Sequence, residues 1–189
     1  RMTDADAPRV APATAGDIDP VTDLWIALAE GQRRHGSTLL AEGNRAAVRD
    51  WVARSVVTGE LLVARPRERR VDDGETDRDA PDPIGFVGFA LDRGDYERDR
   101  TRGTVSNLFV VPARRGEGVG SALLSAAERA LREAGAEAVT LEALADNDRA
   151  REFYARHGYD RHRVELIKSL SADEAASETD GRGETDGTD

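Results

Sequence analysis

The 189-residue sequence contains no cysteine, and Lys168 is its only lysine. Without cysteine the chain can form no disulfide bond, use no thiolate nucleophile and bind no zinc through sulfur. It also has no apolar run long enough to span a membrane, and the first residues, RMTDADAPRV, lack the apolar segment of a signal peptide. These absences favour a cytoplasmic location as the expectation.

The charged residues are unevenly distributed along the chain. The formal net charge of -10 comes from 37 acidic and 27 basic residues, and residues 171–189 alone hold seven acidic residues against Arg182. The rest is nearly balanced, so no basic surface for a nucleic-acid backbone is expected. The strong preference for Arg over Lys resembles proteins of salt-loving archaea, although a GC-rich genome produces the same preference.

The apolar pattern predicts strands that alternate irregularly with helices. This order mixes hairpins with crossover units, so the predicted fold class is α+β, or mixed α/β. The predicted strands start at Arg9 and occupy 60–65, 83–92, 104–111, 136–144 and 159–170, and the predicted helices start near Asp17 and occupy 44–57, 120–135 and 146–158.

Three polar stretches set the expected domain boundaries. Residues 66–83 contain three prolines and almost nothing apolar, which predicts a mobile hairpin insertion. Residues 171–189 have no large apolar side chain, so an acidic, disordered tail is expected there, as is a disordered start at 1–8. One folded domain should therefore occupy residues 9–170.

Three alternating glycines, Gly116, Gly118 and Gly120, stand between a predicted strand and a predicted helix. Glycines at such a junction allow positive φ and close approach of a ligand, and the first N–H groups of the helix favour an anion. The spacing fits neither the dinucleotide-binding G-x-G-x-x-G motif nor the P-loop. A turn that serves only packing is the alternative interpretation.

The residues around these glycines resemble a known family. The stretch LFVVPARRGEGVGSALL is similar to the acetyl-CoA-binding motif of the GNAT (GCN5-related) N-acetyltransferases, which Arg115, Gly118 and Gly120 match. A second stretch, NDRAREFYARHGY, resembles the same family's later signature, and the pattern is most similar to the branch that acetylates ribosomal proteins and protein N-termini. The matching residues of the second stretch are Asn147, Ala150, Phe153, Tyr154, Gly158 and Tyr159.

This resemblance implies a central mixed, mostly antiparallel sheet, flanked by helices, whose fourth and fifth strands splay apart. Acetyl-CoA would lie in the gap as a co-substrate, with Asn147 bonding its pantetheine arm, although a plain helix N-cap is the alternative for this asparagine. Backbone groups of Leu108, Phe109 and Val110 would pair with the pantetheine arm, and the diphosphate would bind the N–H groups of Arg115, Gly116, Glu117, Gly118, Val119, Gly120 and Ser121.

The resemblance also implies candidates for the chemistry. Tyr154 falls where the family commonly places the tyrosine that protonates the departing thiolate; a core or rim aromatic is the alternative. Many members carry an acidic residue on the fourth strand, but here that strand offers only Ser106 and Asn107. Glu142, expected on the fifth strand, is the substitute base, and a glutamate that simply faces solvent is the alternative.

The expected function is acetyl transfer from acetyl-CoA to a primary amine, either a protein N-terminus or a small molecule, by direct attack in a ternary complex. An acyl-CoA-binding regulatory module without turnover is the alternative, and a protein that only offers helix surfaces to a partner would explain neither signature. His35, His157 and His162 are too scattered to predict a metal site. Members of the family often form dimers, so the resemblance allows a homodimer. No membrane partner is expected.

Overall fold

The computed structural model of the protein describes residues 8–66, 81–92, 94, 99–168 and 170. These form two compact units, one within residues 1–152 and one within residues 153–189. The predicted disorder at 1–7 and at 171–189 lies outside the described residues, as does most of the predicted hairpin insertion.

The larger unit contains a five-stranded sheet in the order β1-β2-β3-β4-β5. Its strands are β1 (Arg9–Pro12), β2 (Leu61–Arg65), β3 (Gly85–Leu91), β4 (Arg102–Val110) and β5 (Ala138–Leu141). The pairs from β1 to β4 are antiparallel and the β4–β5 pair is parallel. The predicted mixed, mostly antiparallel sheet is confirmed.

Strand β4 changes its pairing halfway along its length. Its first part, Arg102–Val105, pairs with the whole of β5, whereas Asn107–Val110 pairs only with β3 in the described structure. The β3–β4 register also shifts, because Gly88 lies opposite Asn107 and Phe89 lies opposite Val105. Ser106 is therefore an extra residue in β4. It makes a β-bulge at the point where β4 stops pairing with β5.

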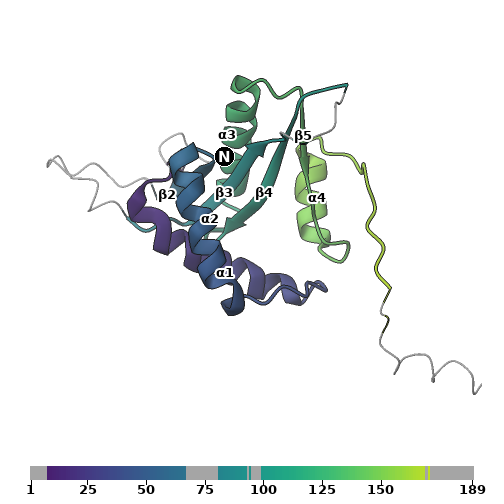
Figure 1. Ribbon diagram of the computed structural model, residues 1–189, viewed down its shortest axis with the longest axis horizontal. Coiled ribbons are helices and arrows are strands. Elements are labelled where there is room, and N and C mark those ends of the chain that lie inside the picture. Colours follow the sequence, from purple (N-terminus) through teal and green to yellow (C-terminus); the bar gives the residue numbers. More distant parts are fainter. Residues whose placement is uncertain (1–7, 67–80, 93, 95–98, 169, 171–189) are drawn as a thin grey trace, which may run out of the picture. The chain divides into compact units, whose positions relative to one another are not determined.

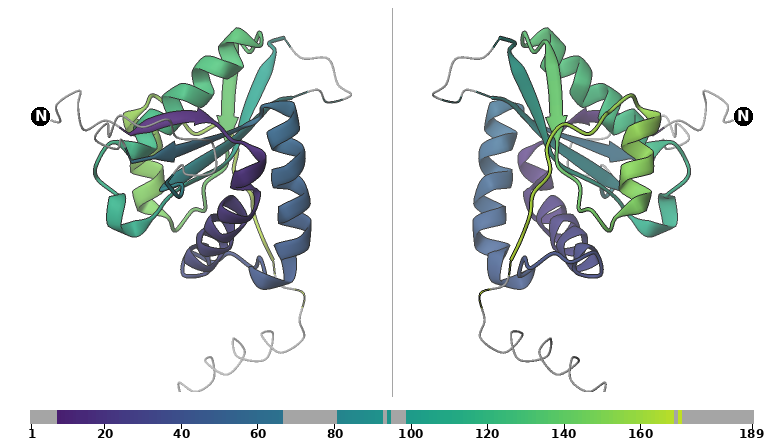
Figure 2. Two further views of the ribbon diagram at one scale, coloured as in Figure 1. Left: turned by 90° about the vertical axis from the view of Figure 1, so that its left-hand side faces the viewer. Right: turned by 90° about the vertical axis from the view of Figure 1, so that its right-hand side faces the viewer.

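Helices cover both faces of this sheet, with α1 and α2 on one face and α3 on the other (Figures 1 and 2). Glycines in the strands show where the helices approach most closely: Gly88 faces Trp51 of α2, whereas Gly103 faces Leu131 of α3. The helices are α1 (Ile18–Arg33), α2 (Arg45–Thr58), α3 (Val119–Glu133) and α4 (Asp148–Arg156).

The core beneath α1 and α2 is apolar, with one buried charged group beside it. Asp17 is buried at the start of α1, where its carboxylate accepts hydrogen bonds from the Thr14 N–H at 2.8 Å and the Thr14 hydroxyl at 3.1 Å, and pairs with Arg65 of β2. This network fixes the chain entering α1 to the sheet. The apolar cluster contains Ala13, Val21, Val48, Val52, Leu61, Val63, Phe86 and Phe109.

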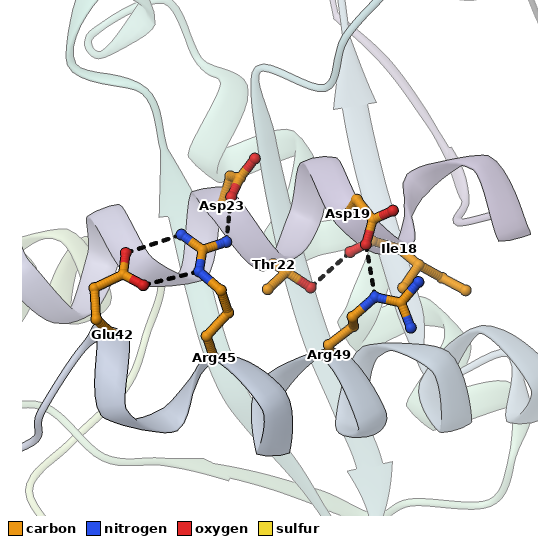
Figure 3. Close-up of polar contacts among 7 residues, drawn as sticks. All are labelled: Ile18, Asp19, Thr22, Asp23, Glu42, Arg45 and Arg49. Atoms are coloured by element: carbon orange, nitrogen blue, oxygen red, sulfur yellow. Dashed lines mark hydrogen bonds and ion pairs between the residues drawn. The ribbon is translucent and has the colours of Figure 1, made fainter.

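Helices α1 and α2 are joined at their exposed edge by arginines of α2 (Figure 3). Arg45 bonds Asp23 of α1 at 2.5 Å and Glu42 at 2.9 Å, and Arg49 bonds Asp19 of α1 at 2.7 Å. These side chains are largely exposed, so water and salt screen their attraction. The apolar contacts beneath them, rather than the ion pairs, hold the two helices together.

One predicted element is wrong. The sequence predicted a closing strand over residues 159–170, but the described residues 159–168 and 170 contain neither helix nor strand. Val164, Leu166 and Ile167, apolar residues of the predicted strand, are each at least 74% exposed. Among the described residues, no helix has the length and apolar character that crossing a membrane requires.

Candidate active site

The glycine turn, defined as Arg115–Gly120, connects the end of β4 to α3 through the short helix η3 (Pro112–Arg114). Gly116 has φ of 84° and Gly118 has φ of 76°, both in the left-handed region that other residues rarely adopt. Gly118 is the residue that precedes α3. The two glycines thus let the chain reverse sharply into the helix.

The start of α3 offers backbone donors to a ligand. Ala122 N–H donates to Gly118 C=O at 3.0 Å, which closes the first turn of the helix. The N–H groups of Val119 and Gly120 precede that bond and have no carbonyl within the helix to pair with. Together with the positive end of the helix dipole, these groups form a site suited to an anion such as a diphosphate.

Arg115 adds positive charge to this turn and is held by β4. Its Nε donates to the carbonyl of Val110 at 2.9 Å, and its guanidinium lies 5.5 Å from the centre of the Phe109 ring. Desolvation lowers the pKa of Arg115, and the positive charges of Arg149 and Arg34 lower it further. Three arginines therefore gather positive charge near the turn, although arginine remains protonated at neutral pH.

The second half of β4 offers backbone groups on its open edge. Val111 N–H bonds the Ile84 carbonyl at 3.0 Å on the β3 side. Since the backbone groups of successive strand residues alternate in direction, those of Phe109 also face β3, whereas those of Leu108 and Val110 face the open edge. A strand-like ligand along this edge would meet Leu108 and Val110.

Asn147 is the N-cap of α4. Its Oδ1 accepts a hydrogen bond from the Ala150 N–H at 3.1 Å, and its backbone carbonyl accepts one from Arg151 N–H at 3.0 Å. The capping role, which the sequence left as an alternative, is therefore present. The cap uses only the amide oxygen, so the Nδ2 group keeps its donors.

Tyr154 belongs to the smaller unit, where it is half-buried among other rings. Phe153 and Tyr159 both meet its ring edge-on, with centroids 5.2 and 5.8 Å away. Burial raises the pKa of Tyr154. Since a phenol already titrates near pH ~10, the hydroxyl is fully protonated at neutral pH and is available as a proton donor.

Glu142 lies in a different place from the one predicted. Strand β5 ends at Leu141, so Glu142 is the first residue after the strand and not part of it. Its side chain is exposed. It belongs to the larger unit and Tyr154 to the smaller, so the two candidates for the chemistry come from different units.

The structure adds contacts that the sequence did not indicate. Two positive charges lower the pKa of Arg115 although they are distant in sequence. They belong to Arg34, at the end of α1, and to Arg149, in the first turn of α4. The Nδ1 of His35 lies 3.0 Å from the Asp146 carbonyl, which joins the loop after α1 to the loop before α4. No sequence motif indicates these contacts. No three His, Asp or Glu side chains within the described part could hold a metal ion.

Comparison with known proteins gives the family. Residues 42–159, more than half of the chain, match the model of the acetyltransferase (GNAT) family. The chain therefore belongs to this family, as the two sequence signatures predicted, and the predicted enzyme class of an acyltransferase is confirmed.

Two curated relatives match shorter stretches. N-alpha-acetyltransferase 30 of Schizosaccharomyces pombe is 33% identical over 79 residues, which cover 41% of this chain and 53% of that protein. An aminoalkylphosphonate N-acetyltransferase of Salmonella typhimurium is 38% identical over 68 residues, which cover 36% of this chain and 44% of that protein. The matches thus span about half the length of these relatives.

Solved structures share the fold. An aminoglycoside N-acetyltransferase in complex with CoA superposes with a TM-score of 0.63 at 14% identity, covering 90% of this chain and all of that one. At this identity the likeness shows the fold alone. The predicted GNAT fold is confirmed by it together with the sheet order described above.

Proposed function

We propose that this protein is an acetyl-CoA-dependent N-acetyltransferase that moves an acetyl group to a primary amine by direct attack. The observation that carries the proposal is the glycine turn, whose left-handed Gly116 and Gly118 lead into α3 directly beside the open half of β4. A diphosphate on the helix N-terminus and a strand-like arm along β4 would use both features of this one junction.

Several features of the described residues fit the CoA part of the donor. A Cβ added at Gly116 would meet no atom within 4 Å, so the turn has open space for a ligand. Arg115 and its two arginine neighbours supply positive charge for phosphates. Leu108 and the Val110 N–H supply backbone groups for an amide-containing arm, since the Val110 carbonyl already accepts a hydrogen bond from Arg115, and the Nδ2 of Asn147 supplies a further donor. Family membership supports the same donor.

In the proposed reaction, the neutral amine attacks the thioester carbonyl, and the C–S bond breaks as the new C–N bond forms. Glu142, acting through a water molecule, removes the proton from the incoming ammonium group. Tyr154 gives its proton to the departing thiolate, and the proton that the nitrogen loses as it becomes an amide returns to the Tyr154 oxygen. The products are the N-acetylated amine and free CoA, so no covalent intermediate on the protein is required.

The donor site is tested by the Gly120→Glu variant. A carboxylate side chain would enter the diphosphate position, so we expect the thermal stabilisation by acetyl-CoA to be lost. For the parent protein, free acetyl-CoA at ~100 times the Kd should stabilise the fold by roughly 2.7 kcal/mol. Gly43→Glu, the same change in the exposed helix η2 (Glu42–Asn44), is the control. A parent protein that shows no shift with acetyl-CoA refutes the proposal.

The proposed proton donor is tested by Tyr154→Phe. A positioned proton transfer is typically worth ~10²–10⁴-fold in rate, so kcat should fall within that range while acetyl-CoA binding is kept. Tyr159→Phe removes a hydroxyl from the neighbouring ring and should retain far more activity. If Tyr154→Phe turns over at the parent rate with chemistry limiting, the assignment is wrong.

The proposed base is tested by Glu142→Gln over a range of pH. Removal of the base should lower kcat/KM most on the acidic side, where the amine acceptor is mostly protonated, and higher pH should partly restore it. An unchanged pH profile would mean that bulk water removes the proton, which is feasible for an exposed position.

A further inference from the structure

A cavity of about 170 Å³ lies between α2 and strands β3 and β4 of the larger unit. The Trp51 ring forms its main apolar wall, and Ala90 and the backbone of Phe89 complete the lining on the β3 side. Its polar lining consists of one carboxylate, from Glu60, and hydroxyl groups from Ser55, Thr104 and Ser106. Arginines are abundant in this sequence, yet none lines the cavity, so its only charged group is negative.

The cavity exists because of local features of β3 and β4. A Cβ at Gly88 would come within 2.7 Å of Trp51 and 2.9 Å of the Ser106 hydroxyl, so only glycine lets both side chains lie against the strand. Ser106 is the extra residue of the β-bulge, and bulges commonly redirect side chains next to active sites. The cavity thus lies beside the part of β4 at which pairing with β5 ends.

The Glu60 carboxylate is the group in the cavity that could bind a cation. It follows Gly59, the C-cap of α2, its side chain is half-buried, and its Oε2 accepts a hydrogen bond from the Thr58 hydroxyl at 2.8 Å. No ion pair joins its carboxylate to another described residue. A half-buried carboxylate beside the Trp51 ring attracts an alkylammonium group, through charge at one end and through contact with the indole along its stem.

We propose that this cavity is a subsite for a second cationic group of the amine acceptor. A carboxylate favours the charged form of an ammonium group beside it, so a nitrogen held by Glu60 stays protonated and cannot attack a thioester. The nucleophile must then be a different nitrogen of the same molecule. This inference rests on the proposed acetyl transfer and narrows the acceptor to diamines, polyamines or similar dications.

The size of the cavity agrees with such a group. An engineered protein cavity of about 150 Å³ holds a molecule as large as benzene, so this one has space for an ammonium group and a few methylene groups. An acceptor with a phosphonate in that position would place two negative charges together, which is unfavourable. The charge of Glu60 therefore selects against anionic acceptors.

The test compares three acceptors of the same chain length that differ at one end: putrescine, 4-aminobutanol and 4-aminobutylphosphonate. With the parent protein, kcat/KM for putrescine should exceed that for the amino alcohol by about tenfold or more, the usual worth of a hydrogen bond to a charged group, and the phosphonate should be poorest. Glu60→Gln should bring the putrescine and amino alcohol values close together. Glu133→Gln, the same change at the exposed end of α3, should leave the preference intact.

Two further measurements separate this inference from the proposed function. The acetyl-CoA thermal shift of Glu60→Gln should equal that of the parent, which shows that the variant is folded and its donor site intact. Calorimetric binding of putrescine to the CoA-loaded parent should weaken by about tenfold in Glu60→Gln, whether or not turnover occurs. Acetylation of amines without a preference for putrescine, or equal binding by parent and variant, overturns the subsite while leaving the acetyltransferase proposal standing.

Discussion

The two faces of the sheet use glycine in the same way but reach different results. Beneath α3, a Cβ at Gly103 would come within 2.6 Å of Leu131, and one at Gly85 within 3.2 Å of Leu123. Beneath α2, Gly88 receives Trp51 and Ser106 instead. The leucines of α3 are almost completely buried, whereas Trp51 is half-buried and Ser106 is exposed beside a cavity.

This difference suggests that the α3 face of the sheet serves packing and that the α2 face serves binding. Where a glycine receives a leucine, the space is filled and the contact contributes stability. Where a glycine receives a tryptophan edge and a hydroxyl, space remains, and its lining carries a charge. We therefore expect changes on the α3 face to alter mainly the free energy of unfolding, and changes on the α2 face to alter mainly the handling of the acceptor.

The largest stability effect is expected for Leu131→Ala. Leu131 is 1% exposed, so its truncation would leave a void beneath α3. Such substitutions typically cost about 2–5 kcal/mol of unfolding free energy, which urea denaturation would measure. Leu40→Ala, at a leucine that is 62% exposed, is the control and should change stability by less than about 0.5 kcal/mol. Equal effects at both positions would show that α3 is not the tightly packed face.

An intermediate effect is expected for glycine-to-alanine changes on the two faces. Gly103→Ala would press a methyl group into the side chain of Leu131, which is 1% exposed, at a cost of about 1–3 kcal/mol. Gly88→Ala should cost less, because Trp51 can shift toward the cavity. The same shift should raise the KM for the acceptor. Urea denaturation and acceptor kinetics on both variants would check this contrast, and a larger stability loss for Gly88→Ala would contradict it.

The smallest effect is expected at the exposed edge of α1 and α2. The hydrogen bond from Arg45 lowers the pKa of Glu42. A lowered folded-state pKa means that the ion pair contributes stability above the ordinary pKa of glutamate and loses it as the pH falls toward the lowered value. Arg45→Gln should therefore reduce the melting temperature only slightly at neutral pH. Melting curves at low pH or in ~1 M salt should show no difference from the parent.

Helix α3 and its turn could be predicted from the sequence, because local patterns determine them. The helix predicted over 120–135 is found as α3, with its apolar stripe of Leu123, Leu124, Ala127 and Leu131 buried and with Gly135, at φ of 97°, just after its end. The glycine turn could also be predicted from its own residues, because the left-handed φ values fall on two of its glycines, Gly116 and Gly118.

Other features depend on partners far along the chain, which no local pattern specifies. Residues 159–170 were predicted as a strand, but a strand also needs a neighbour with which to pair, and the described residues of this segment pair with no strand. Glu142 was expected in β5 because the apolar run continues past it, yet the strand ends one residue earlier. The cavity brings Trp51, Glu60, Phe89 and Ser106 together from separate segments, so no motif could indicate it.

Because only one edge of β4 is paired over its second half, its amide protons should exchange with solvent at different rates. The amide protons of Phe109 and Val111 face β3 and should exchange slowly with deuterated solvent, whereas those of Leu108 and Val110 face the open edge and should exchange quickly. A single strand would then carry an alternating pattern of slow and fast amides. A molecule that lies along the open edge would remove the alternation, so the exchange rates of two amides would report its arrival before any chemistry begins.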